Sequence, residues 1–126
     1  MSLIEVLVSI LIFSFGIVGL IGLQARALQY SSSAEDTARA ALLANEIATA
    51  IVLGQTTPRT QLVPAAAYAT WQARVALPPA DGGLPSGGGT VTALTANTAN
   101  IEITWRPPQA AATAAANKYV TQVTVP

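Results

Sequence analysis

The first half of the chain pairs an apolar segment with an amphipathic one, and no proline separates them. From Val6 to Ala25 there is no ionisable side chain. As a helix, this segment of about 20 residues would span about 30 Å, the thickness of the hydrocarbon core of a bilayer. The pattern therefore predicts one long helix that ends near Leu53, with residues 1–25 as a membrane-spanning part.

Beyond Arg26 the helical pattern becomes amphipathic. Glu35 and Arg39 stand four positions apart on the polar side, which predicts an ion pair on a solvated face. Gly54 predicts the end of the helix. The opposite side gathers the apolar residues Ala40, Ala44, Ile47, Ala48 and Ile51.

The second half of the chain begins with a linker-like segment, residues 55–64, which contains two prolines. The spacing of Ala67, Trp71 and Val75 then predicts a short helix that turns Trp71 toward a core. The glycine-rich stretch 82–89 that follows is typical of a flexible loop, and it lacks the lysine of a phosphate-binding loop.

Three segments of the last third alternate between apolar and polar residues, at 91–94, 101–106 and 119–125. Such alternation predicts strands, and their short connections favour an antiparallel sheet. Trp105, like Trp71, is expected to be buried in the core. The predicted fold is α+β: a long helix packed on about three strands, with residues 26–126 as one globular domain that includes the second half of the helix.

Composition removes several function classes. The chain has no cysteine and no histidine, so a disulfide framework, a cysteine nucleophile and imidazole or thiolate metal ligation have no residues to use. Six basic and six acidic residues give no net charge, unlike a nucleic-acid binder. We therefore expect no enzyme activity, no cofactor, no metal and no nucleic-acid site.

Glu5 is the residue whose position demands an explanation, because it stands at the start of the apolar segment. A carboxylate near hydrocarbon costs about 2.5–3.5 kcal/mol or more unless it is neutralised. It could reach the headgroups or pair with the chain's own amino group. Alternatively, a basic group on another subunit could neutralise it, so that assembly fixes the register between helices.

Gly16, Gly19 and Gly22 are the second candidate feature of the apolar segment. Each glycine weakens a helix by about 0.5–1 kcal/mol relative to alanine, so three within one segment predict a weak point. Their spacing of three also places them on one broad face, where another helix could approach closely. Both readings remain open, beside simple tolerance of glycine in a lipid-facing helix.

The N-terminal segment from Met1 to Ser9 resembles the processed N-terminus of a type IV pilin, a family with a glutamate at the fifth mature position, here Glu5. Further segments are similar to the PilV-type minor pilins of that family. They are residues 10–27, Trp71, the loop Leu84–Gly89 and the strand that ends at Trp105.

The resemblance implies that a prepilin peptidase cuts before Met1, where the family more often has phenylalanine, and that the new amino group is methylated. It also implies that this amine pairs with Glu5 of a neighbouring subunit. The chain lacks the cysteine-bridged loop of major pilins, which favours a minor subunit. It also lacks the proline that often kinks the pilin helix, so any unwinding must come from the glycines at 16, 19 and 22.

A protein of this family would be held in the bacterial inner membrane by one helix, with its C-terminal domain in the periplasm, and then extracted into a pilus. The expected partners are membrane lipid, the prepilin peptidase, other minor pilins, the major pilin and a tip adhesin. The implied function is that of a structural subunit of the pilus tip, which primes assembly and supports adhesion and twitching motility.

Two other readings remain. A pseudopilin of a type II secretion system shares the N-terminal motif and the plan of a helix on a sheet. A single-span, membrane-anchored binding domain would need no special role for Glu5.

Overall fold

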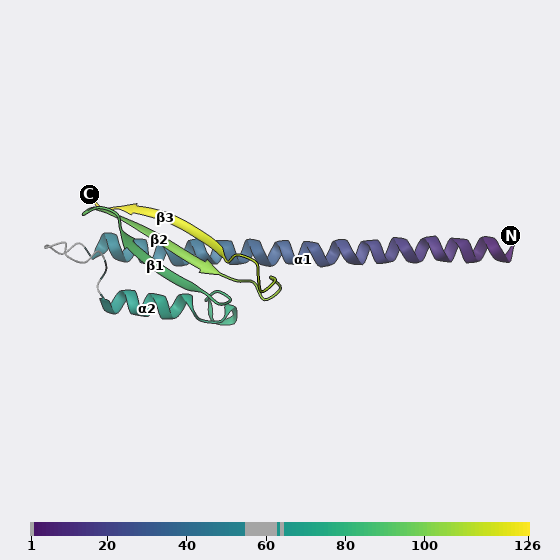
Figure 1. The fold of residues 1–126 in the computed structure, drawn as a ribbon, viewed down its shortest axis with the longest axis horizontal. Helices are drawn as coiled ribbons and strands as arrows, with labels where there is room; N and C mark the ends of the chain where they lie inside the picture. Colours follow the sequence, from purple (N-terminus) through teal and green to yellow (C-terminus); the bar gives the residue numbers. More distant parts are fainter. Residues whose placement is uncertain (1, 55–62, 64) are drawn as a thin grey trace. The chain divides into compact units, whose positions relative to one another are not determined.

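The computed structural model describes residues 2–54, 63 and 65–126 (Figure 1). Its helices and strands are α1 (Leu3–Leu53), α2 (Ala65–Val75), a 3₁₀ turn (Pro79–Asp81), β1 (Gly88–Ala93), β2 (Thr98–Trp105) and β3 (Asn117–Thr124). The prediction of an α+β fold, with a long helix and a three-stranded antiparallel sheet, is confirmed. The linker predicted at 55–64 lies outside the described residues except for Val63.

The chain forms two compact units, which we call the N-terminal unit, up to Ala34, and the globular unit, from Glu35 to Pro126. The N-terminal unit is the first part of α1. The globular unit contains the rest of α1, α2 and the sheet, and it holds every residue of the hydrophobic core.

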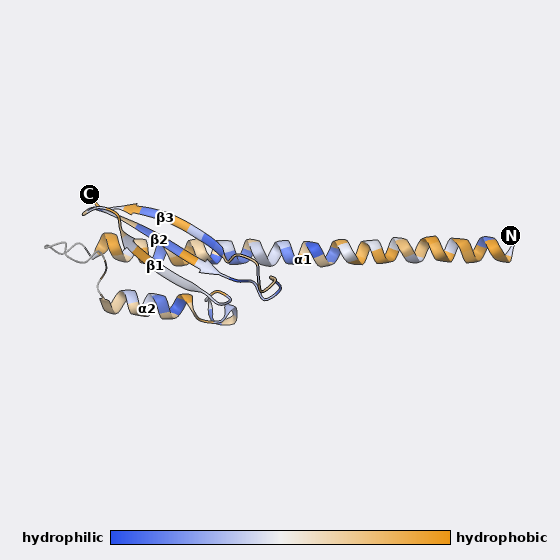
Figure 2. Ribbon diagram, viewed as in Figure 1, coloured by the Kyte–Doolittle hydropathy of each residue, from blue (hydrophilic) through white to orange (hydrophobic). Residues whose placement is uncertain are grey.

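Helix α1 is unbroken from Leu3 to Leu53, as the absence of proline predicts. It ends where Gly54 was expected to stop it, and the Gly54 N–H donates a last helical hydrogen bond of 2.8 Å to the carbonyl of Ala50. Colouring by hydropathy shows how the helix changes along its length: the N-terminal part is almost continuously hydrophobic, and polar residues appear toward the globular unit (Figure 2).

The sheet has the order β1-β2-β3, and both pairs of strands are antiparallel. Ile101 of β2 lies between Val91 of β1 and Thr121 of β3, which fixes the register of all three strands. β2 alternates strictly between buried and half-buried residues, as a central strand with one covered face should. β1 begins at Gly88, three residues earlier than the alternation starting at Val91 indicated, because glycines are poor strand predictors.

One hydrophobic core joins α1, α2, the loop before β1 and the inner face of the sheet. Its buried members are Ala40, Leu43, Ala44, Ile47, Ile51, Trp71, Val75, Leu84, Ala99, Ile101, Ile103, Trp105 and Val125. The apolar stripe predicted on α1 thus covers the sheet. Both tryptophans are buried as expected, and Trp71 Nε1 donates a 2.8 Å hydrogen bond to the carbonyl of Leu43 on α1.

The glycine-rich stretch is not the flexible loop that its composition predicts. A Cβ atom at Gly83 would lie 2.0 Å from the carbonyl oxygen of Leu77, and one at Gly87 would lie 2.3 Å from that of Val75. Between them Leu84 is fully buried, and its N–H donates to the Val75 carbonyl at 3.1 Å. These glycines allow the loop to pack directly on the end of α2.

Candidate functional site

The first candidate site is Glu5 with the apolar helix around it. Glu5 lies in the first turn of α1, where a negative charge is favoured by the helix dipole, and it is exposed. Its backbone carbonyl accepts a 2.8 Å hydrogen bond from the Ser9 hydroxyl. Among the described residues, no group forms a hydrogen bond or an ion pair with its carboxylate. Met1, whose amine was the predicted partner in a neighbouring subunit, lies outside the described residues.

The surface of the helix around Glu5 is apolar and uncovered. The segment Leu3–Leu53 contains a stretch that is long and apolar enough to cross a membrane, and none of that stretch is buried against the described part of the chain. Large hydrophobic side chains face outward on all sides of it, including Phe13 and Phe15, which are each 71% exposed. Such a surface suits lipid or the apolar surface of other helices.

The predicted glycine face is open. A Cβ atom built at Gly16, Gly19 or Gly22 would meet nothing within 4 Å among the described residues. The helix keeps its regular conformation through all three. Ser14, on the same segment, donates its hydroxyl to the Ile10 carbonyl at 2.8 Å and therefore presents no free donor to the apolar surface.

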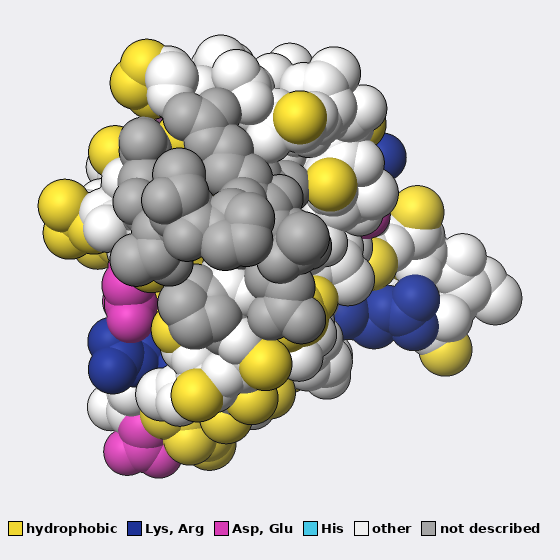
Figure 3. Space-filling view, turned by 90° about the vertical axis from the view of Figure 1, so that its left-hand side faces the viewer, with side chains coloured by type: hydrophobic (Ala, Val, Ile, Leu, Met, Phe, Trp, Pro, Cys, Tyr) yellow, Lys and Arg dark blue, Asp and Glu magenta, His cyan; other side chains and the backbone are white. Residues whose placement is uncertain are grey.

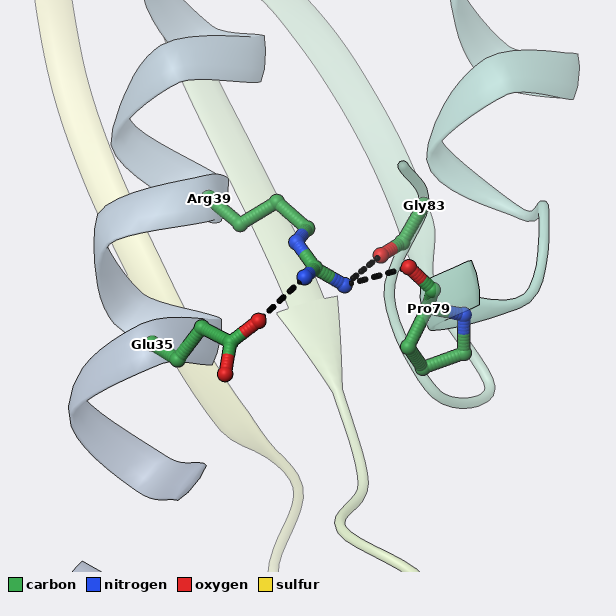
Figure 4. Close-up of polar contacts among 4 residues, drawn as sticks. All are labelled: Glu35, Arg39, Pro79 and Gly83. Atoms are coloured by element: carbon green, nitrogen blue, oxygen red, sulfur yellow. Dashed lines mark hydrogen bonds and ion pairs between the residues drawn. The ribbon is translucent and has the colours of Figure 1, made fainter. Parts of the chain in front are cut away.

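Arg39 does more than the sequence predicts. The expected ion pair with Glu35 is present at 2.5 Å. In addition, Nη1 of Arg39 donates to the carbonyls of Pro79 and Gly83, at 2.8 and 3.1 Å, so the side chain ties the loop before β1 to α1 (Figure 4). The predicted solvated face holds for Glu35, whose side chain is 68% exposed, but Arg39 is half-buried, with 21% of its side chain exposed. No local pattern could reveal these two contacts across 40 and 44 residues.

Asp36 is buried, and sequence reasoning missed it. It is 8% exposed and occupies the position one turn before Ala40 on the buried stripe of α1. Burial raises the pKa of its carboxyl above the usual 3.8, the neighbouring Arg39 opposes this rise, and Glu35 adds to it. The signal was present in the sequence, since position 36 continues the helical spacing of the apolar residues 40, 44, 47 and 51 toward the N-terminus.

The globular unit has a groove of about 340 Å³ between α1 and α2. Three alanines and Ile47 line part of it, together with Thr70 and Trp71 of α2 and Glu46 of α1. Glu46 is engaged by Arg74 at 2.7 Å. On the face drawn in Figure 3, the described acidic and basic side chains lie in separate groups toward the left and right of the view, and hydrophobic side chains occupy several separate places.

The described residues include no group of three or more acidic, cysteine or histidine side chains that could hold a metal ion. The N-terminal unit presents one carboxylate, that of Glu5, on an exposed apolar helix. Comparisons of the chain with protein-family models, with curated proteins and with solved structures each found no match.

Proposed function

We propose that the chain is a structural subunit of a filament assembled from a membrane, and specifically a minor pilin of a type IV pilus. The observation that carries the proposal is the position of Glu5, a carboxylate without a partner among the described residues, at the beginning of an exposed apolar helix. The resemblance of residues 1–9 to processed type IV pilins supports the same reading.

The physical argument concerns two environments for one helix. The apolar surface of α1 is acceptable both to lipid and to a bundle of similar helices. Glu5 distinguishes the two environments, because burial between helices becomes favourable only when a cation is supplied to it. The proposed cation is the N-terminal amine of Met1 in a neighbouring subunit. Pairing of this kind would set the axial register of one subunit against the next.

In this proposal the protein is a single-pass protein of the bacterial inner membrane before assembly, with the globular unit in the periplasm. It then enters the pilus tip with other minor pilins, the major pilin and a tip adhesin. There it primes assembly and supports adhesion and twitching motility. A prepilin peptidase would mature the N-terminus, and N-methylation of the new terminus would follow.

The test is the variant Glu5→Gln in the full-length chain, which keeps the size of the side chain and removes its charge. We expect normal amounts in the membrane and a loss of about tenfold or more in the sheared filament fraction, since an unpaired buried amine costs several kcal/mol. Ser9→Ala is the matched control, because it removes a polar group one turn away without changing the charge.

Unchanged incorporation of Glu5→Gln would contradict the proposal and favour an ordinary single-span anchor. A pseudopilin of a type II secretion system would also depend on Glu5. Secretion assays separate that case, because loss of a pseudopilin stops protein export, whereas loss of a minor pilin reduces piliation and twitching.

A further inference from the structure

The outer edge of β3 is an open row of backbone hydrogen-bonding groups. We propose that this edge binds an extended segment of a different polypeptide, which adds a fourth strand to the sheet. The inference concerns the globular unit and goes beyond the role proposed for Glu5.

The register identifies the groups that form the row. The Val125 N–H donates to the Asn97 carbonyl at 2.7 Å, which makes these residues a hydrogen-bonded pair at the end of the β2–β3 ladder. In an antiparallel ladder such pairs recur at every second residue. The odd-numbered residues of β3 therefore bond to β2, and the even-numbered residues turn their N–H and C=O groups away from it. These residues are Lys118, Val120, Gln122 and Thr124.

Within the described part of the chain, nothing bonds to these outward backbone groups. The opposite edge of the sheet differs, because α2 packs beside β1 and the Gln72 side chain donates to the Gly89 carbonyl at 2.9 Å. Helix α2 thus lies beside β1 and bonds to it at Gly89, whereas no described residue bonds to the outward backbone groups of β3.

The sequence of β3 lacks most of the features that keep an exposed edge strand from pairing with another strand. Soluble proteins protect exposed edges with proline, bulges, short strands or several charges. β3 runs for eight residues with regular pairing, and it contains neither proline nor glycine. Lys118, near its beginning, is its only charged residue. A strand of this composition is a good template for another strand.

The side chains of β3 define the chemistry of the segment that fits. Tyr119, Thr121 and Val123 form the inner row, and all three are half-buried, which leaves their flank uncovered at the edge. An added strand with apolar residues at alternate positions would extend the core over this flank. On the outer face, an acidic or neutral residue would suit the position opposite Lys118.

A second copy of the chain does not fit this edge if both copies are anchored in one membrane. β3 and the adjoining part of α1 run in the same general direction within the globular unit (Figure 1). An antiparallel pair of β3 strands would therefore reverse α1 between the copies. A parallel pair would place the apolar inner row of one sheet beside the polar outer row of the other. The remaining choice is a different polypeptide.

Site-specific photo-crosslinking tests the proposal in cells that naturally produce the full-length chain. A photoreactive amino acid replaces Val120, Gln122 or Thr124 in turn, and mass spectrometry locates the attached residue of the partner. Strand addition requires that each two-residue step along β3 moves the attachment by two residues along one extended segment. Thr92 is the matched control, because it is equally exposed but lies on β1, the strand beside which α2 packs.

Two proline variants test the backbone groups directly. Val120→Pro and Gln122→Pro each remove an outward N–H and leave the β2 ladder donors in place. We expect either variant to reduce the crosslinks from the other positions by about tenfold, because each removes a backbone hydrogen bond to the added strand. Their unfolding is measured alongside by tryptophan fluorescence.

Crosslinks that step in register along one segment of a different polypeptide support the proposal. If the proline variants fail to fold, this crosslinking result is sufficient by itself. Three results would overturn it: no crosslink from β3, attachment to β3 of a second copy, or attachment points without a constant register. Each can occur whether or not Glu5→Gln enters filaments, so the two proposals can fail independently.

Discussion

The backbone of Gly89 lies against the indole ring of Trp71, so closely that a Cβ atom at position 89 would stand 2.4 Å from Cη2 and 2.7 Å from Cζ3. Trp71 is 2% exposed, and Leu43 of α1 accepts its indole N–H. The Trp71 ring therefore connects β1 to α1: one part of it contacts Gly89, and its N–H bonds to Leu43. The absence of a side chain at position 89 makes the contact with β1 possible.

Gly89→Ala should lower the free energy of unfolding of the globular unit by about 1–3 kcal/mol, because the added methyl group must displace a packed ring. Urea unfolding of the full-length chain in detergent measures the change. Tryptophan fluorescence reports on this unit alone, since Trp71 and Trp105 both belong to it.

The neighbouring Gly88 provides a matched control for Gly89. A Cβ atom there would lie 3.4 Å from the Thr104 hydroxyl, which is an ordinary contact. Gly88→Ala should therefore be neutral or slightly stabilising, because alanine loses less backbone entropy in a strand. Equal losses for the two variants would contradict the proposed role of the Trp71 ring.

The main elements of this fold could be predicted because their patterns are local. The stripe of Ala40, Ala44, Ile47 and Ile51 has helical spacing, and the alternation of β2 has the period of a strand, so each predicts which face is buried. The contacts of the glycine-rich loop could not be predicted in this way. They depend on the distance between Gly83 and the end of α2, which is set by tertiary packing.

The candidate site was predictable to a different degree in each unit. Glu5 stood out because a charge beside an apolar run is improbable without a function. For Arg39, the pattern along the helix predicts only the ion pair with Glu35, four residues away. Its contacts with the carbonyls of Pro79 and Gly83 are distant in the sequence and have no local pattern. Asp36 was overlooked because acidic residues are rarely buried, although its spacing placed it on the core face of the helix.

Arg39→Ala should destabilise the globular unit by about 1.5–3 kcal/mol, the range for hydrogen bonds that involve a charged group. The variant removes two hydrogen bonds from the loop before β1: the Gly83 carbonyl loses its side-chain donor, and the Pro79 carbonyl keeps only the 3.2 Å bond from the Gly82 N–H. Hydrogen exchange should locate the change in residues 77–87, and urea unfolding gives its size.

Arg74→Ala is the control for Arg39→Ala. Arg74 pairs with Glu46, and the side chains are 50% and 42% exposed, so the loss should be about 0–1 kcal/mol. Raising the salt concentration should reduce the effect at position 74 more than the effect at position 39, because exposed pairs are screened more strongly. A larger loss for Arg74→Ala would show that the loop carbonyls contribute little.

Ser86→Gly should stabilise the globular unit by about 0.5–1 kcal/mol. Ser86 has a φ of 51°, in the left-handed region that disfavours side chains. It follows Pro85 in a turn closed by a 3.0 Å hydrogen bond from the Gly87 N–H to the Leu84 carbonyl. This arrangement suits glycine at the third position of the turn, although glycine adds some entropy to the unfolded chain.

Ser86→Ala separates backbone strain from loss of the hydroxyl group. Alanine keeps a Cβ atom at the strained position, so this variant should show no gain in urea unfolding. If Ser86→Ala stabilised the unit as much as Ser86→Gly, the benefit would come from the hydroxyl and not from the backbone.

Asp36→Asn should stabilise the globular unit at neutral pH. Burial raises the pKa of the Asp36 carboxyl above 3.8, so the folded state binds its proton more tightly than the unfolded state does. The stability associated with this proton is fully present below the unfolded pKa and is lost as the pH rises through the folded pKa. Asparagine carries no charge at any pH and avoids that loss.

Urea unfolding of both forms from acidic to neutral pH checks this expectation. Below the ordinary carboxyl pKa the wild type and Asp36→Asn should differ little, because both side chains are neutral, and the advantage of the variant should grow as the pH rises. Asp81→Asn, a change at an exposed aspartate of the loop, corrects for the removal of one negative charge. A variant less stable than the wild type at neutral pH would mean that the attraction of Arg39 outweighs the cost of burying the carboxylate.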